Sequence, residues 1–157
     1  MDKLWAPWRI NYISGKRKVK GCIFCLAKKE KSQDQVIFKT RFSIAMLNIY
    51  PYNNGHMLIS PLRHIRDIAQ LQEEEILDLF KSLNKAKNLL QKVLKPQGYN
   101  IGFNLTRVAG AGITGHLHLH IVPRWVGDTN FMPVVFGTKI ISQSLKQLAK
   151  KLKDANR

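Results

Sequence analysis

The sequence predicts an α+β domain, with an antiparallel sheet of about five strands, one long helix and a C-terminal helix. Two observations carry this prediction. Apolar residues recur with the period of a helix over 72–95, and the same pattern is found in a second segment near the C-terminus. Short segments rich in β-branched and aromatic residues, separated by turn residues, recur at 36–38, 42–47, 56–60, 99–105 and 116–122.

The length of 157 residues fits a single domain over 1–157, and the hydrophobic content of 45% is enough for a sizeable core. The sequence contains no apolar run of about 18 residues, the length that a membrane span needs. The N-terminus also lacks the apolar centre of a signal peptide. We therefore expect a cytoplasmic protein with no membrane partner.

The net charge of +16, from 26 Lys and Arg against 10 Asp and Glu, favours an anionic partner such as a nucleotide, nucleic acid or acidic membrane. A lysine-rich solvated surface is an equally good explanation. The basic residues cluster at 16–31 and 139–157, far along the chain from the histidine-rich segment. Charge alone therefore does not locate a site.

The N-terminal segment 1–30 begins with an irregular or short helical lead-in and ends in a Cys-x-x-Cys knuckle formed by Cys22 and Cys25. In a cytosolic chain such a pair is more often metal-binding or redox-active than a structural disulfide. No βαβ pattern lies near the pair, so a metal site is favoured over a thioredoxin-like one. Two buried thiols without a metal are the alternative.

Three strands are expected in the first half of the chain, after a solvated loop over 28–35. A turn at Thr40 separates the first two strands, and the Pro-, Asn- and Gly-containing segment 50–55 precedes the third. Pro61 is expected to end the third strand.

The long helix is predicted over 72–95, with three glutamates in its first turn, where the helix dipole favours negative charge. Pro96 and Gly98 end it. A loop over 126–138 leads into the basic C-terminal segment 139–157, whose amphipathic helix is expected to cover 139–155.

The fourth and fifth strands are joined by the Gly-rich run 109–115 and are expected to pair antiparallel. In the fifth strand His116, His118 and His120 alternate with apolar residues, so the three imidazoles share one face. The Gly-rich run allows backbone N–H groups to approach a bound anion. Three interpretations follow: the polar face of a half-buried strand, a metal site, or a phosphate-transfer site with a histidine nucleophile.

The segment His116-Leu117-His118-Leu119-His120-Ile121-Val122 resembles the signature of the histidine triad (HIT) family of nucleotide hydrolases and transferases. Asn48 with 54–64 resembles the family's first motif, and 100–104 with 109–112 resembles its phosphate loop. Segments 4–9 and 123–133 are similar to the branch of the fragile histidine triad proteins and the diadenosine tetraphosphate phosphorylases. The resemblance covers roughly 3–136 and implies a homodimer whose sheet continues across the interface.

The resemblance also implies a mechanism in which His118 attacks the α-phosphorus of a nucleotide and forms a nucleotidyl-histidine intermediate. Neutral imidazole suits this role, because it is nucleophilic at pH 7 without losing a proton. By the same resemblance His120 donates to phosphate, while His56 orients the nucleophile or donates to phosphate. The implied substrate-binding residues are Asn48 at the ribose and Asn104, Gly110, Gly112 and Thr114 at the phosphates.

Simpler roles remain open: His56 as a buried histidine with satisfied hydrogen bonds, and Asn48 and Asn104 as turn residues. One position departs from the family pattern. Thr106 stands where a glycine is expected, and because a β-branched residue does not adopt a positive φ cheaply, we expect the loop to differ there.

Relatives with a Cys-x-x-Cys pair imply a structural zinc, completed here by the first triad histidine and a histidine after the third strand. The four implied ligands are Cys22, Cys25, His64 and His116.

The favoured function is a dinucleoside polyphosphate hydrolase or phosphorylase acting through His118. One alternative is a metallohydrolase with a water-activating zinc on the triad histidines. The other is a basic, zinc-containing nucleic-acid-binding module using the tail helix at 139–157, although no recognition helix stands out, so nucleic acid is a less favoured partner than a nucleotide.

Overall fold

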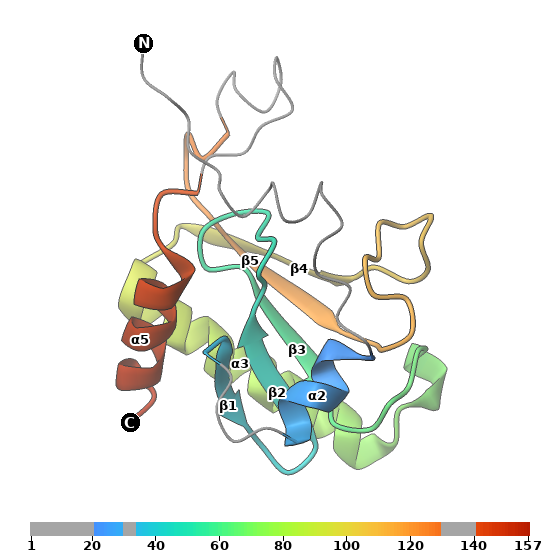
Figure 1. The fold of residues 1–157 in the computed structure, drawn as a ribbon. Coiled ribbons are helices and arrows are strands. Elements are labelled where there is room, and N and C mark those ends of the chain that lie inside the picture. Colours follow the sequence, from blue (N-terminus) through green and yellow to red (C-terminus); the bar gives the residue numbers. More distant parts are fainter. Residues whose placement is uncertain (1–20, 30–33, 130–140) are drawn as a thin grey trace.

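The computed structural model describes residues 21–29, 34–129 and 141–157 (Figure 1). It contains a five-stranded antiparallel sheet in the order β1-β2-β3-β5-β4, which confirms the predicted α+β fold. The strands are β1 (Val36–Lys39), β2 (Ser43–Leu47), β3 (Met57–Pro61), β4 (Gly98–Phe103) and β5 (Leu119–Arg124).

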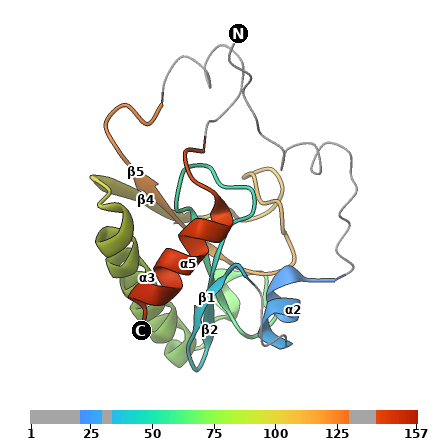
Figure 2. The same cartoon turned by 60° about the vertical axis from the view of Figure 1, so that its left-hand side comes forward.

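Helices cover both faces of the sheet (Figures 1 and 2). Helix α3 (Glu73–Leu94) and helix α5 (Leu145–Ala155) share one hydrophobic core with one face of the sheet. Helix α2 (Ile23–Lys29) packs through Phe24 against Ile44 and Met46 on the other face. Every residue of β2 is buried, because successive side chains of the strand point alternately into the core on one face of the sheet and the core on the other.

The prediction of a helix over 72–95 is confirmed by α3. Its N-terminus is capped by the side chain of Glu75, which accepts a hydrogen bond from the backbone N–H of Gln72. Glu75 also forms an ion pair with Arg63 at 2.7 Å, which attaches the helix to the end of β3. The helix ends at Lys95, whose φ of 48° is left-handed.

The prediction for the C-terminal helix is wrong in its start. Residues 141–144 are not helical, and α5 begins at Leu145 after the N-cap Ser144; residues 139 and 140 lie outside the described part of the chain. Serines compete with a helix by bonding to the nearby backbone, so the pair Ser142 and Ser144 favours a cap over a further helical turn.

Other boundaries also differ from the sequence prediction. Strand β5 begins at Leu119 rather than at His116, because the backbone N–H of Leu117 donates to the carbonyl of Ile65 outside the ladder. Pro61 is the last residue of β3 instead of lying beyond it. Lys28 and Lys29, expected in a loop, end α2. The expected lead-in over 1–15 lies outside the described residues.

Among the described helices, none combines the length and the apolar character that crossing a bilayer requires.

Candidate active site and metal centre

All five histidines of the chain lie close together. His56 precedes β3, His64 follows it, and His116, His118 and His120 lie just before and at the start of β5. His118 and His120 have ring centroids 4.9 Å apart, His56 and His120 5.1 Å, and His64 and His116 4.9 Å. The cluster divides into two parts. His116 and His64 lie beside the two cysteines in a candidate metal site, and His118, His120 and His56 form a hydrogen-bonded group.

His118 is held as a neutral imidazole, and its second ring nitrogen has no hydrogen-bond partner among the described residues. Its Nδ1–H donates to the backbone carbonyl of His116 at 2.8 Å, so the proton resides on Nδ1 and the lone pair on Nε2. Burial lowers the pKa of His118, so the ring is uncharged at neutral pH. The arrangement provides a buried nitrogen nucleophile that needs no base to activate it.

A chain of hydrogen bonds fixes the protons on His56 and His120. The backbone N–H of Tyr52 donates to Nδ1 of His56 at 3.0 Å, so His56 carries its own proton on Nε2. That Nε2–H donates to Nδ1 of His120 at 2.9 Å. His120 must then carry its proton on Nε2.

Nε2 of His120 is buried and has no hydrogen-bond partner among the described residues. Buried donors are normally satisfied, so such an atom is a candidate for binding an external acceptor. A phosphate oxygen placed beside His118 would accept from it. The orphaned donor and the free Nε2 of His118 are thus the two groups that a phosphoryl-transfer step requires.

His56 and His120, whose hydrogen-bonded pair we call the histidine relay, are both neutral at physiological pH. Burial, with the neighbouring His120 and His118, lowers the pKa of His56 to about 3. Burial, with His118, lowers the pKa of His120 to about 4. The relay therefore donates to an anion through neutral N–H groups rather than through a positive charge.

Tyr52 is a site residue that the sequence analysis missed, since it stood in a segment assigned to a turn. Its ring stacks on His120 with an interplanar angle of 8° at 5.7 Å, and lies 4.6 Å from the ring of His56. Its side chain is about half exposed. An aromatic residue four positions before His56 is the only sequence signal that pointed to it.

The predicted substrate-binding asparagines lie next to this relay. Asn48 Nδ2 is 3.2 Å from Nδ1 of His56, and its Oδ1 accepts the backbone N–H of Tyr50. Asn104 Nδ2 is 3.4 Å from the hydroxyl of Tyr52. Asn48 therefore supports His56 directly, besides any role toward a ribose.

The Gly-rich loop leads from Asn104 to His116. Gly110 has a φ of 90°, a backbone conformation that favours glycine, while Gly112 and Thr114 are exposed further along the loop. Thr106 adopts a φ of 68° despite its branched side chain, so the expectation that the loop differs at this residue is wrong. The backbone N–H of Ala111 donates to the carbonyl of Thr106 and closes the turn.

The four predicted metal ligands come together. Cys22 Sγ lies 3.1 Å from Nδ1 of His116, and Cys25 Sγ lies 3.2 Å from Nδ1 of His64. All four ligand atoms lie within 4.8 Å of one another. Burial and the adjacent Cys22 raise the pKa of Cys25, and a thiol that binds a metal gives up its proton to do so. Two sulfurs and two nitrogens fit a tetrahedral zinc.

A hydrogen bond to the backbone orients the ring of His116 for this role. Its Nε2–H donates to the carbonyl of Pro61 at 2.9 Å, which leaves Nδ1 directed at the cysteines. Metal-binding histidines commonly donate their second ring nitrogen to a carbonyl in this way. Phe24, between the two cysteines, contacts the rings of both His116 (5.0 Å) and His118 (5.3 Å). The candidate metal site thus packs against the ring of His118 through Phe24.

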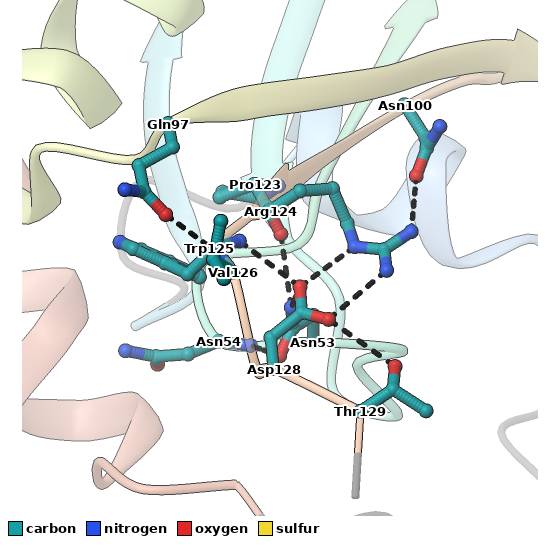
Figure 3. A network of polar contacts seen from close by, with 10 residues as sticks. All are labelled: Asn53, Asn54, Gln97, Asn100, Pro123, Arg124, Trp125, Val126, Asp128 and Thr129. Carbon is teal, nitrogen blue, oxygen red and sulfur yellow. Dashed lines mark hydrogen bonds and ion pairs between the residues drawn. The ribbon is translucent and has the colours of Figure 1, made fainter.

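A second network, which the sequence analysis did not assign, fixes the other end of β5 (Figure 3). Arg124 donates to both carboxylate oxygens of Asp128, at 2.7 and 2.9 Å, and to Oδ1 of Asn100 at 2.6 Å. Asn53 Nδ2 donates to Asp128 and to the carbonyl of Pro123. Arg124 lowers the pKa of Asp128. The network attaches the turn that carries Tyr52 to the end of β5.

Comparison with known proteins identifies relatives over most of the chain. The model of the HIT domain matches residues 29–126. AP-4-A phosphorylase of Mycobacterium tuberculosis (strain ATCC 25618 / H37Rv) is 33% identical over 155 residues, which cover 93% of this chain and 80% of the relative. The asymmetrical bis(5'-nucleosyl)-tetraphosphatase of Schizosaccharomyces pombe is 33% identical over 102 residues, covering 65% of this chain and 56% of the relative.

Among solved structures, a Zn-bound histidine triad family protein from Mycobacterium smegmatis superposes with a TM-score of 0.70. It shares 23% sequence identity, and the match covers 87% of this chain and 93% of that one. The similarity establishes a common fold.

Proposed function

Since this chain belongs to the HIT domain family, we propose that it is a nucleotidyl hydrolase or transferase that cleaves dinucleoside polyphosphates such as diadenosine tetraphosphate. The observation that carries the proposal is the buried, neutral His118 with its Nε2 free, beside the unpartnered Nε2–H of His120. The relatives named for phosphorolysis or hydrolysis of such nucleotides supply the substrate class.

In the first step Nε2 of His118 attacks the α-phosphorus, and the bond from that phosphorus to the bridging oxygen of the polyphosphate breaks. The electron pair of the broken bond leaves with the polyphosphate, and a nucleotidyl-histidine remains. In the second step water or inorganic phosphate displaces His118 and takes up the nucleotidyl group. Two easier displacements thus replace one difficult displacement.

The other residues act by holding protons in place. His120 donates its Nε2–H to a non-bridging phosphate oxygen, where negative charge accumulates in the transition state. His56 fixes the orientation of His120, and Tyr52 and Asn48 fix that of His56. Asn104, Gly110, Gly112 and Thr114 are proposed to contact the phosphates from the Gly-rich loop.

We also propose a structural zinc bound by Cys22, Cys25, His64 and His116. When bound, the metal supplies a cross-link between α2 and the segment before β5. The backbone of His116 carries the carbonyl that fixes the tautomer of His118, so this cross-link also holds the nucleophile in place. Four protein ligands leave no position for a reactive water.

The arrangement disfavours a metallohydrolase that uses the three triad histidines as zinc ligands. Nδ1 of His116 faces the cysteines, that of His118 a backbone carbonyl, and that of His120 the ring of His56. The three rings thus have separate partners. In the nucleic-acid-binding alternative the binding surface would be the exposed lysines of α5, such as Lys146 and Lys150, because the apolar stripe of this helix packs on the core.

A homodimer is the proposed assembly. Strand β4 is an edge of the sheet, and its outer side pairs with no other described strand, which leaves room for a strand of a second copy. The flank of α3 that carries Ile76 and Phe80 is apolar and about half exposed. Lys87 lies two helical turns after Phe80, on the same side of α3. Its carbonyl accepts a hydrogen bond from the hydroxyl of Tyr99 in β4, so this side of the helix lies next to β4. A second copy joined there would extend the sheet.

Product analysis tests the proposed function. The wild-type protein and His118→Ala would be incubated with diadenosine tetraphosphate, with and without inorganic phosphate, and the nucleotides separated. ADP with ATP, formed only with phosphate, identifies a phosphorylase; AMP with ATP identifies a hydrolase. We expect His118→Ala to lose at least about a thousandfold in rate, because it lacks the nucleophile. Equal rates for the two proteins would exclude the covalent mechanism.

A further inference from the structure

A shallow pocket of about 250 Å³ adjoins the histidine relay on the side of β4. Tyr52 belongs to both, since its ring stacks on His120 and also lines the pocket. A pocket of this size is below the roughly 300–1,000 Å³ of sites that enclose a whole ligand, so it fits one part of a larger molecule. Its described lining residues are Tyr52, Asn53, Asn100, Val122, Arg124 and Thr129.

The pocket lies on the face of β5 that bears the reacting histidines. Because side chains alternate along a strand, Val122 and Arg124 share the face of His120, at roughly 6.5 and 13 Å from it along the strand. Asn48, the proposed ribose contact, follows β2 on the other side of β3 in the sheet order. A transferred nucleoside near Asn48 therefore lies over the β2 side of the relay, which leaves the pocket on the β4 side open to another part of the substrate.

The neighbouring strand leaves this face almost bare. Gly102, Asn100 and Gly98 of β4 stand opposite His120, Val122 and Arg124 in the register of the two strands. A Cβ built on Gly98 or Gly102 would meet no atom within 4 Å. The face of β4 next to the relay thus provides a flat, open floor on which a planar group can lie.

The walls of the pocket carry little net charge, and Figure 3 shows the polar contacts around Arg124 that belong to them. The guanidinium of Arg124 is fixed in its plane by Asp128 and Asn100, and the carboxylate of Asp128 balances its charge. The remaining lining is aromatic, aliphatic, amide and hydroxyl. Such a lining suits an uncharged heterocycle and its sugar better than a phosphate, since bases stack on aromatic rings and guanidinium planes.

We propose that this pocket binds the second nucleoside of a dinucleoside polyphosphate, the one that departs with the leaving polyphosphate. The inference rests on the proposed function and adds to it a reason for preferring substrates with a nucleoside at both ends. The base lies over the bare face of β4, between Tyr52 and Arg124. Asn100 and Thr129 offer polar groups to its edge or to the sugar.

The test compares kcat/KM for diadenosine tetraphosphate and for adenosine 5′-tetraphosphate, which has the same phosphate chain without the second nucleoside. We expect the wild-type protein to prefer the dinucleotide by about tenfold, the order of one stacked base. Thr129→Tyr fills the pocket from an exposed position and should reduce the preference to about one. Val126→Tyr is the matched control, because Val126 is exposed in the same loop but lines no part of the pocket.

Gly98→Val provides a second variant that does not depend on the loop. The added side chain has open space around it and suits a strand, so the fold should tolerate it while the floor of the pocket is obstructed. Equal kcat/KM values of the wild-type protein for the two nucleotides would overturn the inference. So would a preference unchanged in both Thr129→Tyr and Gly98→Val. Failure of the wild-type protein to cleave either nucleotide would instead overturn the proposed function.

Discussion

The histidines of this site differ in which ring nitrogen carries the proton, and backbone groups decide the difference. A carbonyl accepts from Nδ1 of His118, whereas a backbone N–H donates to Nδ1 of His56. The first contact creates a nucleophile at Nε2, and the second creates a donor. Identical side chains thus take opposite roles, which a residue name alone does not reveal.

The low pKa values of His56 and His120 predict a dependence of stability on pH. Below about pH 6.5 both histidines take up protons in the unfolded chain, whereas in the folded protein His56 stays neutral down to about 3 and His120 down to about 4. The unfolded state then binds more protons, so the free energy of unfolding falls as the pH drops from about 6.5 to 4.

The variant His56→Gln isolates this effect, because every other titrating group is common to both proteins. Urea unfolding at a series of pH values should give a shallower loss of stability on acidification for His56→Gln than for the wild-type protein. Parallel curves for the two proteins would show that His56 is not held neutral by the fold.

Thr106 provides a prediction about backbone strain. A residue other than glycine at a positive φ costs of order 1–3 kcal/mol, and a branched side chain adds to the crowding. Thr106→Gly should therefore raise the free energy of unfolding, by about 1 kcal/mol after the greater freedom of glycine in the unfolded chain is subtracted. Chemical denaturation measures the change. Thr106→Ala is the control, since it removes the hydroxyl and the methyl group but keeps the Cβ that is strained at a positive φ. An equal increase in the free energy of unfolding for Thr106→Ala would contradict the strain argument.

Helix α2 is too short to be stable by itself, at seven residues. Its order depends on tertiary contacts: Phe24 and Ala27 are buried, and the two cysteines approach His64 and His116. We infer that the proposed zinc holds this element in place, and through Phe24 supports the ring of His118.

Removal of the metal should therefore loosen α2 without eliminating the reaction. We expect about one zinc per chain in the purified protein, and after chelation a lower melting temperature and roughly tenfold slower turnover, both restored by zinc. Metal analysis, thermal unfolding and kinetics measure these effects. Cys25→Ser should resemble the chelated protein, whereas Lys29→Ala, at an exposed position of α2, should resemble the wild type. Complete and immediate loss of turnover on chelation would favour the metallohydrolase instead.

At the scale of the whole molecule, the sheet ends at strand β4, whose outer side pairs with no other described strand. Strand β4 has exposed residues in its centre, including Ile101, and the adjoining flank of α3 exposes Phe80. Side chains of this size and apolar character on one continuous surface are typical of an interface.

The proposed homodimer can be disrupted at that surface. The double variant Phe80→Lys with Ile101→Lys places four positive charges in a symmetric interface, so it should sediment as a monomer while the wild-type protein sediments as a dimer. Val126→Lys adds charge at an exposed position away from this surface and should leave the wild-type mass unchanged. A monomeric wild-type protein would show that β4 is a free edge.

Local pattern predicted most of the fold. The helix over 72–95, with its three-glutamate start, and the short strands require only neighbours in the sequence, and the structure confirms them apart from their exact limits. The triad spacing and the Cys-x-x-Cys pair pointed to the same residues that the structure brings together. The expected cytoplasmic location and the single domain over 1–157 stay predictions.

Tertiary structure alone decided what those residues can do. The strand limit at Leu119 depends on a hydrogen bond from Leu117 to Ile65, far away in the chain. The proton positions of His118 and His56 depend on carbonyl and amide groups placed by the fold, and the roles of Tyr52 and Arg124 depend on loops that meet only in space. Periodicity records which face a side chain takes, but contacts between distant segments have no period, so no local pattern encodes them.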